Sequence, residues 1–241
     1  MNNRNAYIGK NVETLFKNSI GNHLDIINKI KDVFKIKGRF LDAINTGMHA
    51  EKVDVKIGFS CGHYIDVSIK AYKAKIAYNQ LTRTSLYNFC KTFDLDCLEY
   101  LQNLFINKAK KVSSSLFPIE EQQKALSIFQ PISKKMLKWS FSNKTARELL
   151  ALYEREKSEM RIYVMKDVLK NLDQDITFTN KGNILIGKFI VIQRKGGNGI
   201  HVHGTVDKDN LKHPGNNIQL KLKVKDFVDG MQNYELANYF I

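Results

Sequence analysis

Residues that break a chain into separate parts are scarce in this sequence. It contains 3 prolines and 14 glycines in 241 residues, and no stretch is rich in proline or in glycine and serine. Such stretches form the linkers between independent domains. We therefore expect one sizeable hydrophobic core, or one core with a modest added lobe, which the hydrophobic content of 43% can supply.

Cysteine is also rare, and long apolar runs are missing. Cys61, Cys90 and Cys97 have no paired short spacing, which argues against a disulfide framework or a zinc ribbon. The apolar run from Ile184 to Ile192 is far shorter than the ~20 residues that cross a bilayer. The polar segment from Met1 to Lys10 does not resemble a secretion signal. These absences predict a cytoplasmic protein with no membrane partner.

Acidic residues are outnumbered by basic ones. The 24 Asp and Glu face 38 Lys and Arg, which gives a formal net charge of +14 and a sequence pI near 9.5. Each phosphate that a basic protein neutralises releases counterions, so such a protein gains affinity for any nucleic acid. The charge therefore favours a nucleic-acid partner, and solubility alone is the competing explanation.

The hydrophobic period changes along the chain. Apolar residues at helical spacing predict a long amphipathic helix over 12–34 and a shorter helix over 39–45. Polar and apolar residues then alternate over 52–59 and over 63–70, with Ser60-Cys-Gly62 between the two segments. Alternation of this kind on both sides of a short polar loop predicts a β-hairpin.

The rest of the chain is predicted to be mainly helical up to residue 159 and β-rich after it. Helices are expected after Ala77, with one apolar stripe over 86–93 and another over 98–105, over 120–159 except near Pro131, and over 166–172. Strands are expected over 161–165, 176–179, 183–194, 200–206 and 218–224. Helices and strands in this order predict an α/β (α+β) protein with a mixed central β-sheet flanked by helices. The expected segments are 1–110, 111–165 and 166–241, all within one compact unit.

Three residues of the predicted hairpin carry functional chemistry. Asp54 lies on its first strand, and Ser68 and Lys70 lie two residues apart on its second strand, so these two point to the same side. If the register brings Asp54 opposite that side, a carboxylate, a hydroxyl and an amine converge. Hydrolysis of a phosphodiester uses this combination: a carboxylate for Mg²⁺, further oxygen ligands, and a cation near the scissile phosphate.

The hairpin resembles the catalytic core of the PD-(D/E)xK nuclease superfamily, and of type II restriction endonucleases in particular. The resemblance rests on Lys52-Val-Asp54-Val and Ile65-Asp-Val-Ser68-Ile-Lys70-Ala, followed by Asn79-Gln80-Leu-Thr-Arg83, and covers residues 38–95 well. It extends loosely to the C-terminal third, at Ile192-Gln-Arg-Lys-Gly-Gly197 and Ile218-Gln-Leu-Lys221. It implies a restriction-endonuclease-like core that cleaves double-stranded DNA with Mg²⁺ in the cytoplasm of a prokaryote. It also implies a cognate DNA methyltransferase and, for palindromic sites, a homodimer.

The resemblance also assigns roles to individual residues. Asp54 is expected to hold Mg²⁺, Ser68 to complete or orient the coordination sphere, and Lys70 to position and activate the attacking water. Ser68 stands where the family usually has Asp or Glu, and a hydroxyl brings no charge. Metal binding is therefore expected to depend more on the backbone carbonyl of Ile69 and on a helper acid.

Two acids are candidates for that helper. Glu51 lies three residues before Asp54, although an ordinary exposed charge ahead of the strand explains it equally well. Asp66 shares a strand face with Ser68 and is the weaker candidate. A rival centre at Gln193-x-Lys195 has the polar-x-Lys form and follows Asp175, but the glycines after it favour a DNA-contacting element.

Eight polar side chains are candidates for DNA contacts. They are Asn79, Gln80 and Arg83 at the start of a predicted helix, and Gln193, Arg194, Lys195, Gln219 and Lys221 on predicted strands. Side chains of these types reach base edges and phosphates. The first group could instead cap the helix, and the second could form a basic, solvated sheet face.

Two other functions stay open. A repair or junction-resolving nuclease could use the same core. A non-catalytic, basic DNA-binding protein could use the hairpin as a scaffold only, with Asp54 and Lys70 as ordinary solvated charges.

Overall fold

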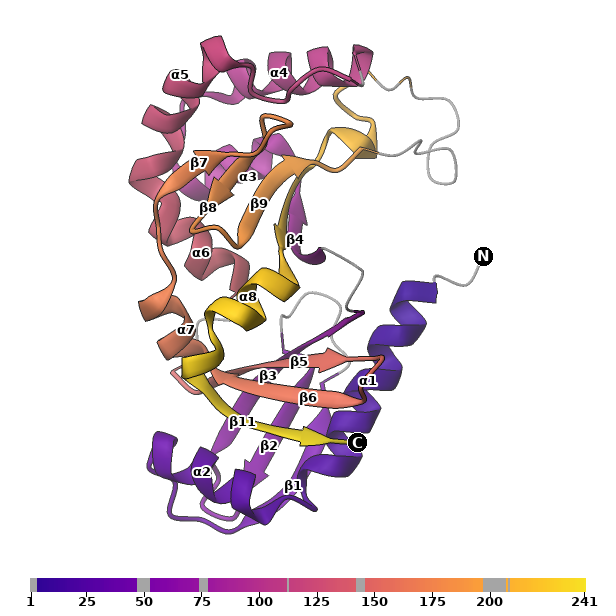
Figure 1. The fold of residues 1–241 in the computed structure, drawn as a ribbon, viewed down its shortest axis with the longest axis vertical. Helices are drawn as coiled ribbons and strands as arrows, with labels where there is room; N and C mark the ends of the chain where they lie inside the picture. The colour runs from indigo at the N-terminus through magenta and orange to yellow at the C-terminus, as the bar shows by residue number, and fades with distance from the viewer. Residues whose placement is uncertain are drawn as a thin grey trace. The chain divides into compact units, whose positions relative to one another are not determined.

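The chain is divided into two compact units, each built from separate stretches of sequence. The computed structural model describes residues 4–46, 53–73, 78–111, 113–141, 146–196, 207 and 209–241. The six-stranded unit comprises Met1–Asn79, Phe141–Asn171 and Phe227–Ile241, and the five-stranded unit comprises Gln80–Ser140 and Leu172–Asp226 (Figure 1). The consecutive segments 1–110, 111–165 and 166–241 expected from the sequence cut across this division.

The six-stranded unit contains a mixed β-sheet with helices packed against it. Its elements are α1 (Arg4–Ile20), α2 (Leu24–Phe34), β1 (Phe40–Asn45), β2 (Val55–Phe59), β3 (Tyr64–Tyr72), β5 (Glu148–Glu154), β6 (Glu159–Val164), α7 (Met165–Asn171), a 3₁₀ turn (Gln232–Tyr234) and β11 (Glu235–Phe240). The strand order is β1-β2-β3-β5-β6-β11. Only the β3–β5 pair is parallel among the pairs of this sheet, so the predicted fold class, a mixed sheet flanked by helices, is confirmed.

One face of this sheet is buried, and the other is covered in part. One face packs against α1 and α2 through buried apolar side chains, which include Phe16, Ile20, Ile27, Ile30, Val55, Ile57 and Val67. The other face is covered in part by α7 and by aromatic side chains, where the rings of Tyr163 and Phe227 lie 5.4 Å apart. The hairpin that carries the predicted site therefore packs one face against α1 and α2.

The predicted β-hairpin is confirmed as β2 and β3. Their register pairs Val55 with Val67 and Gly58 with Tyr64. Gly62 in the connecting loop has a φ of +77°, a conformation that costs a residue with a Cβ about 1 kcal/mol or more. The Gly62 N–H donates to the carbonyl of Phe59 at 2.9 Å, which closes the turn.

The long helix expected over 12–34 is wrong, because two helices occupy this stretch. A turn at Gly21 and Asn22 separates α1 from α2. A Cβ at Gly21 would lie 2.9 Å from the ring of Phe40, so glycine allows the chain to turn close against that side chain. The apolar stripe continues across the turn because both helices cover the same sheet, and this continuity suggested one helix.

Three further stretches predicted as helix are strands. Residues 40–45 form β1, residues 79–84 form β4, and residues 148–154 form β5. Every residue of β5 is buried, in the strand that lies between β3 and β6. Its Glu, Leu and Ala residues favour helices as single residues, but pairing on both sides and burial override that preference.

The five-stranded unit combines a second sheet with a layer of helices. Its elements are β4 (Asn79–Thr84), α3 (Leu86–Phe93), α4 (Leu98–Lys110), α5 (Ile119–Phe129), α6 (Ser133–Phe141), β7 (Ile176–Phe178), β8 (Ile184–Ile186), β9 (Ile190–Arg194), β10 (Ile218–Leu222), α8 (Val224–Gly230) and 3₁₀ turns at Gln130–Ile132 and Pro214–Asn216; β4, α6 and α8 extend across the unit boundaries. The strand order is β4-β10-β9-β8-β7. The strands predicted over 176–179 and 218–224 are confirmed as β7 and β10, although β10 ends at Leu222. The single strand predicted over 183–194 is wrong, because two strands, β8 and β9, occupy it, and the strand predicted over 200–206 lies outside the described residues.

Aromatic side chains fill the helical layer of the five-stranded unit. The ring of Phe89 lies 4.9 Å from that of Phe93 and 6.2 Å from that of Trp139, all measured between centroids. Ser85 caps the first helix of this layer, because its Oγ accepts the N–H of Asn88 at 3.2 Å. In the parts of the chain that the structure describes, no helix is long and apolar enough to cross a membrane.

Candidate active site

Asp54 lies at an irregularity immediately before β2. Its N–H donates to the carbonyl of Val67 at 2.9 Å, while the next residue, Val55, is also paired with Val67. Two residues of one strand thus face one residue of the other, which is the arrangement of a β-bulge. Bulges change the direction of a side chain. This bulge turns the side chain of Asp54 toward Ile69 and Lys70 of β3.

Asp54 and Lys70 form an ion pair, and both side chains contact the backbone of Ile69. The Oδ2 atom of Asp54 accepts the N–H of Ile69 at 2.6 Å and lies 3.4 Å from Nζ of Lys70. The same Nζ donates to the carbonyl oxygen of Ile69 at 3.0 Å. The structure therefore brings together the acid, the amine and the carbonyl that the sequence had singled out.

The cluster is reachable from solvent. The side chains of Asp54 and Lys70 are each 21% exposed, so the pair is neither a buried structural ion pair nor a freely solvated one. Two hard oxygen atoms, the carboxylate of Asp54 and the carbonyl of Ile69, both contact one cationic group. Oxygen ligands of this kind suit Mg²⁺, which binds through one or two carboxylates and keeps several waters, so the donor set fits the expected ion.

Glu13 of α1 is a further acid beside this pair, and sequence reasoning did not find it. Burial raises the pKa of the Glu13 carboxyl, the negative charge of Asp54 raises it further, and the positive charges of Lys70 and Lys10 lower it. Helix α1 packs against β3, which brings these charges near one another. The only feature of the sequence that pointed to Glu13 was its position next to Val12 in an amphipathic helix.

Ser68 lies two residues before Lys70 on β3. It lines a small cavity together with Val53, Asp66 and Glu148, and both of these acidic side chains are buried. Among the described residues, its hydroxyl forms no hydrogen bond to Asp54 or Lys70. Asp66, the weaker candidate helper, thus lines the same cavity as Ser68.

The expected metal ligands are only partly described. Glu51 lies outside the described residues. Within the ranges that the structure describes, no group of three or more His, Cys, Asp and Glu side chains converges as a ready metal site. Any divalent ion here would therefore depend on Asp54, the Ile69 carbonyl, water, and oxygen atoms of the substrate.

The candidate DNA contacts separate into different environments. Asn79 is used internally, since its Nδ2 donates to the carbonyl of Ala71 at 2.7 Å. Gln80 and Arg83 are exposed on β4, a strand where a helix had been predicted. Arg194 donates from Nε to Oδ1 of Asn216 at 2.6 Å, and burial lowers its pKa.

The remaining candidates share one face of the second sheet. Gln193 is paired with Gln219, and Lys221 follows two residues later on β10, so alternation places the three on the same side. Burial lowers the pKa of Lys221. Burial also lowers the pKa of Lys195, and the positive charge of Arg83 lowers it further. Neighbouring positive charges of this kind are stabilised by a bound anion such as phosphate.

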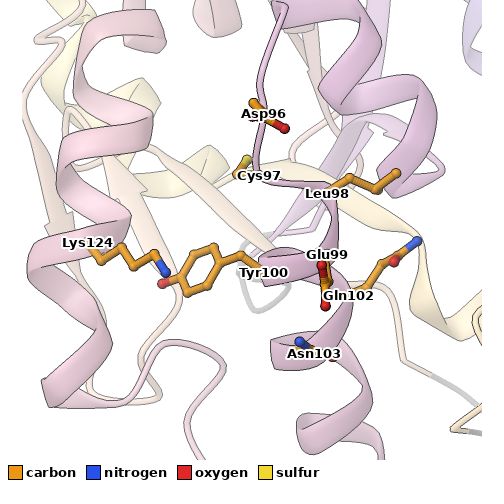
Figure 2. Close-up of a pocket in the computed structure, with 8 residues that line it drawn as sticks. All are labelled: Asp96, Cys97, Leu98, Glu99, Tyr100, Gln102, Asn103 and Lys124. Atoms are coloured by element: carbon orange, nitrogen blue, oxygen red, sulfur yellow. The ribbon is translucent and has the colours of Figure 1, made fainter.

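An open hollow of about 610 Å³ lies between α4 and α5 of the five-stranded unit. Figure 2 shows Asp96 and Cys97 at the start of α4 and Lys124 reaching from α5 toward Tyr100. The Lys124 Nζ lies 4.2 Å from the centre of the Tyr100 ring, a cation–π distance. The residues that line the hollow carry charges of both signs, and none of them is a nucleophile paired with a base. We therefore assign no chemistry to the hollow.

A comparison with solved structures finds the restriction endonuclease MspI in complex with its cognate DNA. The two chains share 13% sequence identity with a TM-score of 0.48, and the match covers 87% of this chain and 82% of that chain. No protein-family model and no curated protein sequence matches the chain. A likeness at this level assigns no role to any residue.

Proposed function

We propose that this protein is a type II restriction endonuclease, a Mg²⁺-dependent enzyme that hydrolyses double-stranded DNA at a specific sequence. The observation that carries the proposal is the cluster in which Asp54 and the Ile69 carbonyl both contact Nζ of Lys70, within 3.4 Å and 3.0 Å. The net charge of +14 supports DNA as the substrate.

Each residue of the cluster has a role in this proposal. Asp54 and the carbonyl of Ile69 would hold the Mg²⁺ ion, which supplies a Lewis acid that neutralises charge on the phosphate when bound. Lys70 would orient the attacking water and stabilise negative charge that develops on the phosphate. Glu13 would be the helper acid, which the effect of the Asp54 charge on its pKa supports, and Ser68 would act through ordered water.

Cleavage of unmethylated plasmid DNA tests this function. The wild-type protein should cut with Mg²⁺ and stop cutting when EDTA is added, and Asp54→Asn and Lys70→Met should each cut about 100-fold more slowly or worse. Asp25→Asn and Lys29→Met, both exposed on α2, are the matched controls and should cut like wild type. Wild-type rates in both site variants would exclude the assigned site.

The pattern of products distinguishes the competing functions. Discrete bands from linear DNA of known sequence support restriction, and cutting only at junctions or damaged sites supports a repair nuclease. Binding with a strong salt dependence but no cleavage supports a non-catalytic DNA-binding protein. The proposed restriction function further requires a methyltransferase that protects the host DNA, and a homodimer would match a two-fold symmetric site.

A further inference from the structure

Two glutamine side chains form a hydrogen-bonded pair at the edge of the second sheet. The Nε2 atom of Gln219 donates to Oε1 of Gln80 at 2.5 Å. Gln219 is buried, with 6% of the residue exposed, whereas Gln80 is exposed on the neighbouring strand β4. A buried amide thus holds the amide of an exposed residue.

The pair belongs to a polar row that crosses adjacent strands. Gln219 is paired in register with Gln193 of β9, and β10 lies between β4 and β9. The opposite face of β10 carries Ile218, Leu220 and Leu222, which are buried in the apolar core. The row therefore lies on the face of this sheet that is turned away from that core, next to Lys221.

The hydrogen bond couples the orientations of the two amides. With Nε2 of Gln219 as the donor, a reversal of the Gln80 amide alone would bring two NH₂ groups together, and the bond would be lost. The fixed amide still has two N–H donors and a second lone pair on Oε1. A side chain that is already oriented loses less conformational freedom when it binds.

Resting on the proposed function, we propose that Gln80 reads an adenine in the recognition sequence and that Gln219 is a positioning residue for this contact. In the major groove adenine presents the N7 acceptor beside the N6 donor, which matches the N–H and carbonyl of a glutamine amide. Guanine presents two acceptors, N7 and O6, and leaves the amide oxygen without a donor. With Gln219 as the donor, the Gln80–Gln219 bond keeps the Gln80 amide in the orientation that distinguishes the two bases.

A randomised duplex library, selected by cleavage and separately by binding, tests the proposal. The preferred duplex of the wild-type protein should contain an adenine whose replacement by 7-deazaadenine, which lacks N7, weakens recognition about 10-fold or more. Gln80→Ala should lose this sensitivity, and Gln219→Leu should reduce it while the melting temperature shows that the fold persists. Gln232→Ala, at an exposed position of the six-stranded unit, is the control and should keep it.

The outcomes separate this inference from the proposed function. If the wild-type protein recognises DNA selectively but Gln80→Ala keeps the full 7-deazaadenine effect, the inference is wrong and the proposed function stands. If binding shows the Gln80-dependent effect but nothing is cut, the inference stands and the endonuclease function is wrong. A wild-type protein with no sequence preference in either selection contradicts both.

Discussion

The carboxylate of Asp54 accepts the main-chain N–H of Ile69 at 2.6 Å and lies 3.4 Å from the ammonium group of Lys70. The first contact fixes the carboxylate relative to the backbone of β3, and the second fixes the amine relative to the carboxylate. The two side chains therefore form one arrangement, and a substitution at either position changes the surroundings of both. Stability and activity can be separated here by the choice of substitution.

Replacement of Asp54 by alanine should cost more stability than replacement by asparagine. Asparagine keeps an oxygen that can accept the Ile69 N–H, whereas alanine leaves this part-buried donor without its partner, at a cost of about 1–3 kcal/mol. Urea unfolding of the two variants measures the difference, and plasmid cleavage should be lost in both. Equal stabilities would contradict the structural role of the hydrogen bond.

Glu13→Gln should raise the Mg²⁺ concentration needed for cleavage. The carboxyl of Glu13 interacts electrostatically with Asp54 and Lys70, so its removal takes negative charge away from the proposed ion site. The cleavage rate is titrated against Mg²⁺ concentration. The concentration that gives half the maximal rate should be several-fold higher than in wild type, because one ligand or outer-shell partner of the ion is lost. The exposed Glu120→Gln serves as control, and an identical titration for both variants would exclude Glu13 from the site.

Arg161→Met should destabilise the six-stranded unit. Arg161 forms ion pairs with Glu159 at 2.7 Å and Glu235 at 2.8 Å, and the three side chains are between 7% and 17% exposed. Removal of one partner leaves buried charges uncompensated, which typically costs roughly 3–5 kcal/mol. Lys110→Met, which breaks the exposed pair with Asp209, should change the free energy of unfolding by about 1 kcal/mol or less.

Binding of DNA should weaken steeply as salt concentration rises. The logarithm of the association constant should fall linearly with the logarithm of salt concentration, and Lys195→Gln or Lys221→Gln should each reduce the slope by about 1 if the residue contacts phosphate. Fluorescence anisotropy in Ca²⁺ buffer between about 50 and 200 mM salt measures both quantities. Unchanged slopes would remove these two lysines from the interface.

The parts of the fold that the sequence predicted are those in which local pattern and tertiary packing agree. Alternation over 52–59 and 63–70 predicted β2 and β3 because one face of each strand meets the apolar core. The segment 148–154 misled because its residues favour a helix and are buried on both faces, so no alternation marks the strand.

The candidate site was predictable to the same extent. The approach of Asp54 to Lys70 follows in part from a short hairpin, in which the turn fixes the register of the strands. The bulge at Asp54, which the sequence did not predict, supplies the rest. Glu13 was not predictable, because its position depends on how α1 crosses β3 after a long stretch of chain. The amide pair of Gln80 and Gln219 joins strands far apart in sequence, and a helix had been expected at Gln80.

The parallel pairing of β3 with β5 joins two strands that are separated along the chain by residues 80–140 of the other unit. During synthesis β3 therefore emerges well before β5. Until β5 follows, the edge of β3 opposite β2 carries hydrogen-bonding groups with no strand beside them. Closing so long a segment slows folding, and an open apolar strand edge invites pairing with other chains. We expect products that terminate early, before Glu148, to aggregate, and ribosome pausing in that stretch to lower the yield of native protein.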